Sequence, residues 1–363
     1  MLPVCRRRLS TQALKGTRLD VADARRTAPD ADALLDRFGR RHTYLRVSLT
    51  ERCNLRCSYC MPPQGVELKP DDELLTTPEL VTAIRALVRL GVTKVRLTGG
   101  EPLVRKDIVA LVEQIHSLGV SNIGVTSNGI VFARHARALK QAGLSHVNLS
   151  LDTLDASRFK RITQRDGHGK VMQSLHMASA LFHNVKVNCV VQRGVNDDEL
   201  AAFAALTRDE ALQVRFLEFM PFGLNQWQTE RVVSGAEMLQ AIKAVYPGIV
   251  PCPEEDGPSP TARLFKIPGF KGRVGFITAM TDEFCSTCSR LRLTADGNLK
   301  NCLFGNHEVS LRDALRSGQG DAGVLAVVRA SLEAKHERLG GYANSHAIAE
   351  HSATARPMIL IGG

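Results

Sequence analysis

Long apolar runs and aromatic side chains are scarce in this sequence of 363 residues. No apolar stretch reaches the roughly 18 residues that a transmembrane helix needs, so we expect no membrane span. Aromatic residues make up 5% of the chain, which is few for a protein that stacks nucleic-acid bases on aromatic rings. The hydrophobic share of 44% and the charged share of 23% are ordinary for a globular protein.

The first 19 residues contain no acidic side chain and lack the apolar segment of a secretory signal. They carry five basic residues, which equals half of the net charge of +10, together with Ser10, Thr11 and Thr17. An Arg-rich, hydroxyl-containing and acid-poor leader is typical of an organellar transit peptide, and a disordered basic tail is the alternative. We predict a transit peptide over residues 1–19 and a linker over residues 20–41.

Short apolar runs alternate with longer amphipathic stretches from residue 44 to residue 220. The predicted strands are Tyr44–Thr50, Lys94–Thr98, Asn122–Thr126, His146–Leu151, Val185–Val191 and Leu212–Phe219. The predicted helices are Pro78–Leu90, Lys106–Leu118, Phe132–Ala142, Val171–Phe182 and Asp197–Glu210. Repeated strand–helix units predict a parallel sheet with right-handed crossovers. Six units are too few for a closed eight-stranded barrel, so we expect an α/β fold with an open, partial (β/α)6 barrel over residues 42–222. A doubly wound sheet is the alternative.

The pattern changes after Met220. A Pro- and Gly-rich stretch over residues 251–260 precedes short strand-like runs up to Leu293, and polar helical sequence follows around residues 310–338. We therefore predict a C-terminal domain over residues 223–363 that covers the open side of the barrel.

Nine cysteines in a chain without a secretory signal indicate metal or redox chemistry in a reducing compartment. Cys189 lies in an apolar run and is expected in the core. Six others form two trios near the two ends of the chain: Cys53, Cys57 and Cys60, and Cys285, Cys288 and Cys302. Three thiolates leave one iron of a [4Fe–4S] cube open to a chelating amino acid. Structural zinc is the alternative, but it usually takes four protein ligands, and no fourth is evident beside either trio.

The first trio has the spacing C-x3-C-x2-C directly after the first strand, which resembles the signature of the radical S-adenosylmethionine superfamily. The sequence Thr98-Gly-Gly-Glu-Pro102, at the end of the second predicted strand, is similar to the GGEP motif of that superfamily. The resemblance implies that these glycines let the backbone approach S-adenosylmethionine.

The second trio narrows the resemblance to one family. Phe284-Cys-Ser-Thr-Cys-Ser-Arg-Leu-Arg-Leu-Thr-Ala-Asp-Gly-Asn-Leu-Lys, followed by Cys302-Leu-Phe, is similar to the GTP 3′,8-cyclases of molybdenum-cofactor biosynthesis, the MoaA family. Residues 44–50 and the ending Arg356-Pro-Met-Ile-Leu-Ile-Gly-Gly agree, so the resemblance runs from about Phe38 to the last residue. Residues 265–270 and the ending are most similar to eukaryotic members. This favours the mitochondrial matrix, with the cytoplasm as the alternative if the leader is not a transit peptide.

The resemblance implies a lyase that converts GTP to (8S)-3′,8-cyclo-7,8-dihydroguanosine 5′-triphosphate through a 5′-deoxyadenosyl radical. It implies two [4Fe–4S] clusters, S-adenosylmethionine, an electron donor, a downstream cyclic pyranopterin monophosphate synthase and a homodimer, with no nucleic acid or membrane as partner. By motif position, the S-adenosylmethionine site is expected to include Tyr59, Gly100, Ser150 and Met220. Contacts to GTP are expected from Arg46, Arg96, Thr126, Lys186, Arg290, Leu291 (through its backbone) and Arg292. The family's terminal glycines reach the active site, which implies a catalytic role for Gly362 and Gly363.

The residue pattern by itself agrees with part of this site. Barrel enzymes place their chemistry at the C-terminal ends of strands, where the sequence puts Gly100, Thr126, Ser150 and Met220. Lys186 and Asn188 alternate with apolar residues, so they are expected to face the barrel lumen. A surface-facing antiparallel strand is the alternative. Arg290 and Arg292 are suited to pair with phosphates.

Two other function classes stay open on the residues alone. One is another radical enzyme with two clusters, such as a peptide-modifying maturase, although those generally carry more C-terminal cysteines. The other is a zinc-stabilised protein that binds nucleic acid, which the net charge and the cysteine pairs suggest.

Overall fold

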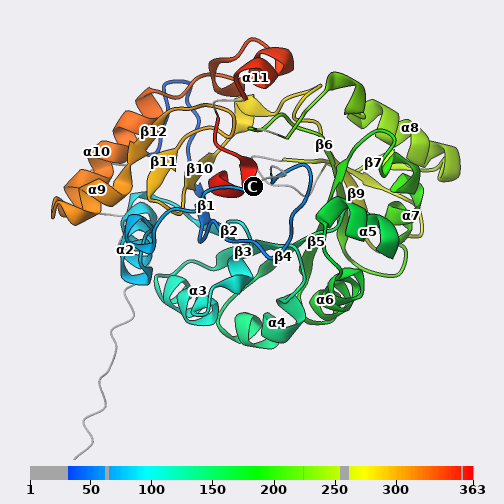
Figure 1. Ribbon diagram of the computed structural model, residues 1–363, viewed down its shortest axis with the longest axis horizontal. Coiled ribbons are helices and arrows are strands. Elements are labelled where there is room, and N and C mark those ends of the chain that lie inside the picture. The colour runs from blue at the N-terminus through cyan, green and yellow to red at the C-terminus, as the bar shows by residue number, and fades with distance from the viewer. Residues whose placement is uncertain (1–31, 62–64, 224, 254–260, 353–354, 363) are drawn as a thin grey trace, which may run out of the picture.

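The computed structural model describes residues 32–61, 65–223, 225–253, 261–352 and 355–362. One mixed sheet of twelve strands curves around the middle of the molecule, with helices on its outer side (Figure 1). The strand order is β12-β11-β10-β1-β2-β3-β4-β5-β6-β9-β8-β7. The predicted leader lies outside the described residues.

Six neighbouring parallel strands form the central part of the sheet. They are β1 (Tyr44–Ser48), β2 (Lys94–Thr98), β3 (Asn122–Ser127), β4 (His146–Ser150), β5 (Asn184–Val191) and β6 (Gln213–Glu218). All six predicted strands are confirmed, and their spatial order follows the chain. A doubly wound sheet would reverse its strand order near the middle, so that alternative is wrong.

Residues 223–363 continue this sheet at both of its edges. Strand β10 (Arg290–Leu293) pairs in parallel with β1, and β9 (Arg273–Ile277) pairs in parallel with β6. Antiparallel strands follow outside them: β11 (Asn298–Lys300) and β12 (Glu308–Ser310) beyond β10, and β8 (Arg263–Lys266) and β7 (Val250–Pro251) beyond β9. The C-terminal region therefore brings its own residues into the wall of the barrel.

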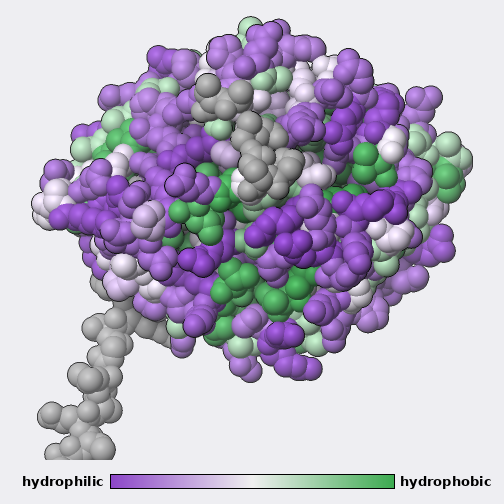
Figure 2. All heavy atoms as spheres, in the orientation of Figure 1, coloured by the Kyte–Doolittle hydropathy of each residue, from purple (hydrophilic) through white to green (hydrophobic). Residues whose placement is uncertain are grey.

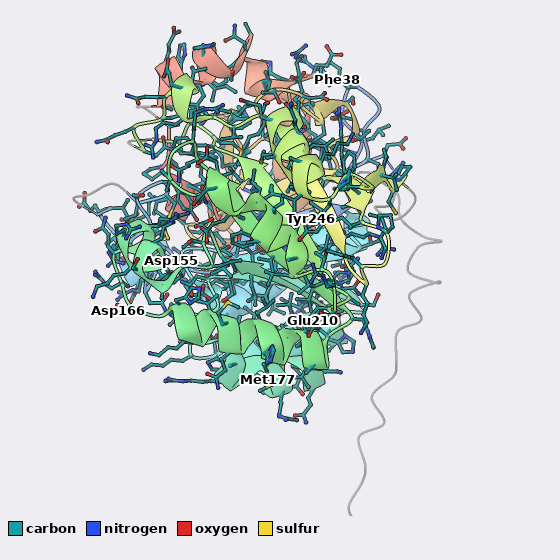
Figure 3. All side chains as sticks on the ribbon, turned by 90° about the vertical axis from the view of Figure 1, so that its right-hand side faces the viewer. Phe38, Asp155, Asp166, Met177, Glu210 and Tyr246 are labelled. Atoms are coloured by element: carbon teal, nitrogen blue, oxygen red, sulfur yellow. The ribbon has the colours of Figure 1, made fainter. Side chains whose placement is uncertain are left out.

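Helices between the strands lie on the outer face of the sheet, as Figures 1 and 3 show. They are α2 (Thr77–Leu90), α3 (Ile108–Ser117), α4 (Phe132–Gln141), α5 (Ala156–Thr163), α6 (His168–Leu181), α7 (Leu200–Ala205) and α8 (Gly235–Val245). Thr76 and Glu79 form a capping box at the start of α2, and Gly91 ends this helix with a φ of 120°. In Figure 3, Asp155 and Asp166 lie toward one end of this outer wall, while Glu210 and Tyr246 lie nearer to the other.

The remaining helices lie near the C-terminus or are single turns. The former are α9 (Leu311–Arg316), α10 (Gly320–Glu333), α11 (Ser345–Ser352) and α12 (Met358–Ile361). The 3-10 turns are Asp71–Glu73, Pro102–Val104, Asp197–Glu199, Thr229–Arg231, Cys285–Thr287 and Leu339–Gly341. In the described part of the chain, no helix is long and apolar enough to cross a membrane.

The core lies between the sheet and its outer helices. Leu45 and Val47 of β1, for example, are fully buried and belong to one hydrophobic cluster with Ile84 and Leu87 of α2. Cys189 is buried in the same cluster, which confirms its predicted place. Apolar side chains thus occupy alternate strand positions on the outer face of the sheet, and the other positions face inward. The face of the molecule that Figure 2 shows is mostly hydrophilic, with smaller hydrophobic areas between.

Candidate active site

A cavity of about 500 Å³ lies against the inner face of the sheet. Strands β1 to β6 and β10 line it, together with the segments around residues 283–289 and 301–304. The predicted site residues that line it are Arg46, Tyr59, Arg96, Thr126, Ser150, Lys186, Met220, Cys285, Cys288, Arg290, Arg292 and Cys302. The fold thus brings residues from both ends of the chain to one space.

Three arginines stand in one row across neighbouring strands of this cavity. Arg292 of β10 lies opposite Arg46 of β1, and Arg46 lies opposite Arg96 of β2. Burial and the neighbouring guanidinium groups lower the pKa of Arg46 to about 10 and that of Arg292 to about 9. Nη1 of Arg292 is buried and has no hydrogen-bond acceptor among the described residues. This row is therefore arranged to receive an anion.

The next strands of the sheet, β3 to β5, form a polar wall of the cavity, with atoms that lack a hydrogen-bond partner among the described residues. Thr126 of β3 lies opposite Asn148 of β4, which lies opposite Lys186 of β5. Among the described residues, Oγ1 of Thr126 and the Oδ1 atoms of Asn148 and Asn188 are buried without a hydrogen bond. Buried polar groups are normally satisfied, so these atoms indicate a polar ligand. Strand β5 is parallel to both neighbours and its lysine lines the cavity, so the alternative of a surface-facing antiparallel strand is wrong.

The first cysteine trio lies in the loop after β1, where Cys57 is buried and the other two are half-buried. Backbone N–H of Leu55 donates to Sγ of Cys53 at 3.4 Å, and Nδ2 of Asn128 lies 3.7 Å from the same sulfur. Burial raises the pKa of Cys53 to about 11. A hydrogen bond with Cys60 and burial raise the pKa of Cys57. Metal binding at these thiols would therefore release protons.

The Gly-Gly turn after β2 packs against the segment that leads into this trio. The N–H of Gly100 donates to the carbonyl of Thr50 at 2.8 Å. A Cβ at Gly99 would lie 2.6 Å from the oxygen of Thr50, and one at Gly100 would lie 2.3 Å from the oxygen of Arg52. Only glycine permits this close backbone approach. The carboxylate of Glu101 is fully buried and accepts hydrogen bonds from the hydroxyl of Ser127, at the end of β3, and from the N–H of Asn128. These bonds fix the turn.

Tyr59 is joined to two other segments of the cavity wall. Its hydroxyl donates to Oδ2 of Asp152 at 2.8 Å, and Oδ1 of Asp152 accepts from the N–H of Val190 at 2.9 Å. Nδ2 of Asn225 donates to the carbonyls of Tyr59 (3.2 Å) and Met220 (2.9 Å). Asn225 thus links Tyr59 and Met220, which are both expected at the S-adenosylmethionine site. Burial raises the pKa of Asp152 to about 6.

The second cysteine trio is half-buried and lines the cavity. Backbone N–H of Leu339 donates to Sγ of Cys285 at 3.5 Å. Burial raises the pKa of Cys285. Burial also acts to raise that of Cys288, but the positive charges of Arg290 and Lys335 outweigh it and lower this pKa to about 7.

No three His, Cys, Asp or Glu side chains of the described chain are arranged as a site for a single metal ion. Each trio offers three thiols, which is the donor type that iron–sulfur clusters take.

The last described residues reach the C-terminal end of β2. The hydroxyl of Thr98 donates to the carbonyl of Gly362 at 3.2 Å, and Gly362 is buried with a φ of 77°. Ile361 packs in a small cluster with Met220 and Phe222. Figure 1 shows this end of the chain in the middle of the curved sheet. Gly363 lies outside the described residues.

Several predicted residues do not line the cavity. The first cysteine trio, Gly100, Leu291 and Gly362 are not among its lining residues. The side chain of Leu291 is fully buried in the outer core, as its place between two cavity-lining arginines requires.

Sequence reasoning missed other residues of the cavity wall, notably Tyr44, Lys94, Asn148, Asp152 and Arg215. A signal for two of them was present: Tyr44 and Lys94 precede Arg46 and Arg96 by two positions on the same strands. The two-residue period of a strand puts such pairs on one face.

Two family models match the chain. The Radical SAM superfamily model matches residues 47–207, and the Molybdenum Cofactor Synthesis C model matches residues 212–340. Membership of the radical SAM superfamily implies S-adenosylmethionine and one [4Fe–4S] cluster.

Curated relatives identify the family. The protein named "GTP 3′,8-cyclase, mitochondrial" of Arabidopsis thaliana is 49% identical over 337 residues, which cover 92% of this chain and 85% of that relative. The chain belongs to the GTP 3′,8-cyclase family. A member of this family from Pelotomaculum thermopropionicum is 41% identical, over 90% of this chain and 99% of its own length. "Molybdenum cofactor biosynthesis protein 1" of Mus musculus is 53% identical over 92% of this chain but only 52% of its own length. The chain thus spans about half the length of that curated relative.

Among solved structures, SuiB of Streptococcus suis bound to its precursor peptide SuiA has a similar fold. The TM-score is 0.53 at 13% identity, over 88% of this chain and 74% of that chain. This similarity concerns the fold alone, and it agrees with the GTP 3′,8-cyclase family's partial barrel.

Proposed function

We propose that the chain converts GTP to (8S)-3′,8-cyclo-7,8-dihydroguanosine 5′-triphosphate, as a lyase in the first step of molybdenum-cofactor biosynthesis. The observation that carries the proposal is the row of Arg292, Arg46 and Arg96 at the cavity. Guanidinium groups this close repel one another, and a triphosphate with about four negative charges relieves that repulsion. Two relatives named GTP 3′,8-cyclase, 49% and 41% identical, support the reaction.

The two cysteine trios would hold two [4Fe–4S] clusters, the first at Cys53, Cys57 and Cys60 and the second at Cys285, Cys288 and Cys302. When bound, the first cluster supplies the electron that cleaves S-adenosylmethionine to methionine and the 5′-deoxyadenosyl radical. The chain's own contribution is to bind, orient and exclude water. S-adenosylmethionine would contact Tyr59, Gly100, Ser150 and Met220, two of which share Asn225 as a hydrogen-bond partner.

GTP would lie between the arginine row and the polar wall of the cavity. Its phosphates would accept hydrogen bonds from Arg46, Arg96, Lys186, Arg290 and Arg292, with Leu291 contributing through its backbone. The unpartnered oxygen of Thr126 is available to the same ligand. Cys285, Cys288 and Cys302 line the same cavity and would hold the second cluster, which would supply a binding site for the purine.

Gly362 and Gly363 would complete the active site from the C-terminal segment. The contact between Gly362 and Thr98, beside the Gly-Gly turn, supports this role. An electron donor, a downstream cyclic pyranopterin monophosphate synthase and a second copy of the chain are the proposed partners.

We propose the mitochondrial matrix as the location of the protein. The basic, acid-poor leader supports it, and so does the printed name of the Arabidopsis relative.

An anaerobic assay with GTP, S-adenosylmethionine and dithionite tests the proposed function. We expect 5′-deoxyadenosine and the cyclised nucleotide in equal amounts, from a protein with about eight iron atoms per chain. Arg292→Leu should abolish nucleotide cyclisation, whereas Arg89→Ala, which removes an exposed ion pair with Asp321, should not change it. Wild-type protein that yields 5′-deoxyadenosine but no cyclised nucleotide would show that the substrate is wrong.

A further inference from the structure

Tyr44 lines the cavity, and it is not among the site residues that the family resemblance implies. It is the first residue of β1 and lies in register between Lys94 of β2 and Arg290 of β10. Its hydroxyl accepts a hydrogen bond of 2.7 Å from Nε of Arg96. Nζ of Lys94 lies 4.8 Å from the centre of its ring, which is the distance of a cation–π contact. One half-buried phenol thus contacts two of the cations that line the cavity.

The guanidinium of Arg96 is held from two further directions. Its Nη1 donates to the carbonyl of Val125 at 3.2 Å. Gly124 lies directly beneath it: a Cβ at this position would approach Cζ of Arg96 to 2.9 Å. Tyr44, the Val125 carbonyl and the bare backbone of Gly124 therefore fix one orientation of the guanidinium. Nε and Nη1 make these bonds, which leaves Nη2 for a ligand in the cavity.

We infer that Tyr44 is a positioning residue for the triphosphate of the substrate, acting through Arg96 and Lys94. The inference rests on the proposed function, because it takes GTP as the ligand of the cavity. In its protonated form, a phenol fixes the planar guanidinium without adding a full negative charge beside it. A carboxylate at the same place would neutralise Arg96 and compete with phosphate for its N–H groups. Tyr44 thus orients the cation and leaves its charge available.

The charges around Tyr44 add a second, pH-dependent signature. Four cations face the phenol: Arg46 on its own strand, Lys94 and Arg96 on β2, and Arg290 opposite it on β10. Burial opposes ionisation, but the positive charges of Arg96, Arg46 and Lys94 outweigh it and lower the pKa of Tyr44 to about 7. A bound triphosphate disfavours the phenolate, so GTP should bind preferentially to the protonated phenol. Affinity should therefore fall as the pH rises from about 6 to about 8, unless the hydroxyl is absent.

The test compares Tyr44→Phe with wild type and with Tyr246→Phe in anaerobic, cluster-loaded protein. Phe keeps the ring and its contact with Lys94 and removes only the hydroxyl. Tyr246 is a matched control, because its ring packs against Phe270 away from the cavity. We expect Tyr44→Phe to raise the Kd and the KM for GTP about tenfold, with kcat at saturating GTP and iron content unchanged. The GTP affinity of Tyr44→Phe should also stay constant between pH about 6 and about 8, where that of wild type is expected to fall.

Gly124→Ala provides an independent second variant, since it displaces the Arg96 guanidinium without touching Tyr44. If both residues act through Arg96, their effects on the Kd for GTP should not multiply. The Kd of the double variant Tyr44→Phe/Gly124→Ala should be at most about twofold above that of the single variant with the higher Kd. The inference would be overturned if the losses of GTP affinity in the two single variants multiplied in the double variant. It would also be overturned if Tyr44→Phe and wild type had the same GTP affinity and the same pH dependence. If wild-type protein does not bind GTP, the proposed function and this inference fail together. If wild type binds GTP and Tyr44→Phe binds it equally well at every pH, only the inference fails.

Discussion

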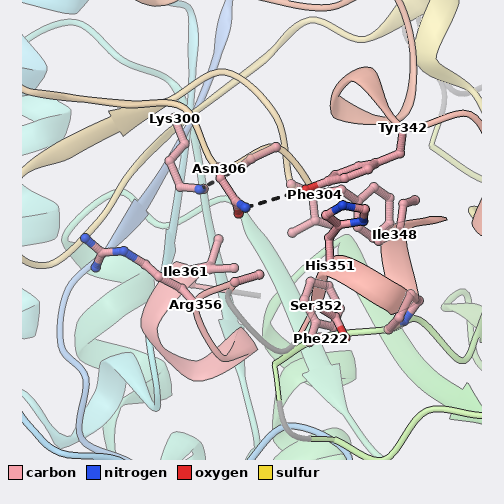
Figure 4. Close-up of a pocket in the computed structure, with 14 residues that line it drawn as sticks. Phe222, Lys300, Phe304, Asn306, Tyr342, Ile348, His351, Ser352, Arg356 and Ile361 are labelled. Atoms are coloured by element: carbon pink, nitrogen blue, oxygen red, sulfur yellow. Dashed lines mark hydrogen bonds between the residues drawn. The ribbon is translucent and has the colours of Figure 1, made fainter.

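Nη2 of Arg356 donates a hydrogen bond of 2.8 Å to the carboxylate of Asp296, whose side chain is 1% exposed. The same carboxylate oxygen lies 2.6 Å from Nζ of Lys69, in the segment after the first cysteine trio. Arg356 also lies 2.7 Å from Glu308, which pairs with the buried Lys300. Figure 4 shows Arg356 beside the last helical turn, with Lys300 nearby. This ion-pair network joins the C-terminal segment, the C-terminal strands and the loop of the first trio.

Replacing Arg356 should release the C-terminal segment from the middle of the barrel. Arg356→Ala removes one of the two cations that pair with the buried carboxylate of Asp296, which costs roughly 2 kcal/mol. We expect faster backbone hydrogen exchange over residues 358–362 and loss of cyclised product, with iron content unchanged. Unchanged exchange in this segment would contradict the prediction. Arg89→Ala, which breaks an exposed ion pair, is the control.

A side chain at position 362 should block cyclisation. A Cβ on Gly362 would lie 2.5 Å from Oγ1 of Thr98, and the φ of 77° disfavours other residues. We expect Gly362→Val to lower the rate of cyclised nucleotide formation at least about a hundredfold while both clusters still load. Gly318→Val has a similar φ of 74° but meets nothing within 4 Å, so it should leave the rate unchanged. Comparable rates for the two variants would refute the prediction.

Arg40 is expected to position the second cysteine trio. Its guanidinium donates to the carbonyls of Cys285 (2.8 Å), Glu337 (2.6 Å) and His336 (3.0 Å), and it pairs with the buried Asp36 at 2.7 Å. Without its side chain, three carbonyls and a carboxylate each lose a hydrogen-bond donor. We expect Arg40→Ala to hold about four iron atoms per chain instead of about eight, measured by iron and sulfide analysis.

The neighbouring Arg41 supplies the control for this experiment. Its ion pair with Asp32 is exposed, with side-chain exposures of 49% and 82%. Arg41→Ala should therefore keep both clusters. If Arg40→Ala also keeps about eight iron atoms, the prediction is wrong.

Stability should fall on mild acidification because of His42. Burial, with the positive charge of Lys335, lowers the pKa of this histidine to about 4, and its Nδ1 lies 3.0 Å from the carbonyl of Arg40. In the unfolded chain its pKa is about 6.5. Between these values the unfolded chain binds more protons, so the contribution of His42 is complete above pH about 6.5. It is lost as the pH falls to about 4, by at most roughly 3 kcal/mol.

Anaerobic unfolding in denaturant, followed by circular dichroism at several pH values, measures this loss. His42→Gln should show a shallower decrease of the unfolding free energy between pH about 6.5 and about 4 than wild type. The exposed His307, changed to Gln, should behave as wild type. Identical decreases in the His42 variant and wild type would exclude a role for this proton.

The sequence predicted the sheet well, because strands buried under helices have apolar runs of recognisable length bounded by glycine. Helix α5 was missed, since Phe159 and Ile162 are too few to give a clear period. The predicted helix over residues 197–210 was too long. It ends at Ala205, because the carbonyls of Thr207 and Arg208 accept hydrogen bonds from Gly272 and Lys271 instead. Such a contact between distant segments leaves no mark in the local sequence.

By itself the sequence determined which chemistry this protein carries, because thiol spacing, the Gly-Gly turn and paired arginines are local patterns. Only the tertiary structure decided that Arg46, Arg96 and Arg292 form one row. That alignment depends on β10 joining the far edge of β1 in one register, and a shift of one residue would turn Arg292 into the outer core. The role inferred for Tyr44 has the same origin, since its hydroxyl meets Arg96 only across paired strands. Strand register is set by packing over the whole sheet, and no motif records it.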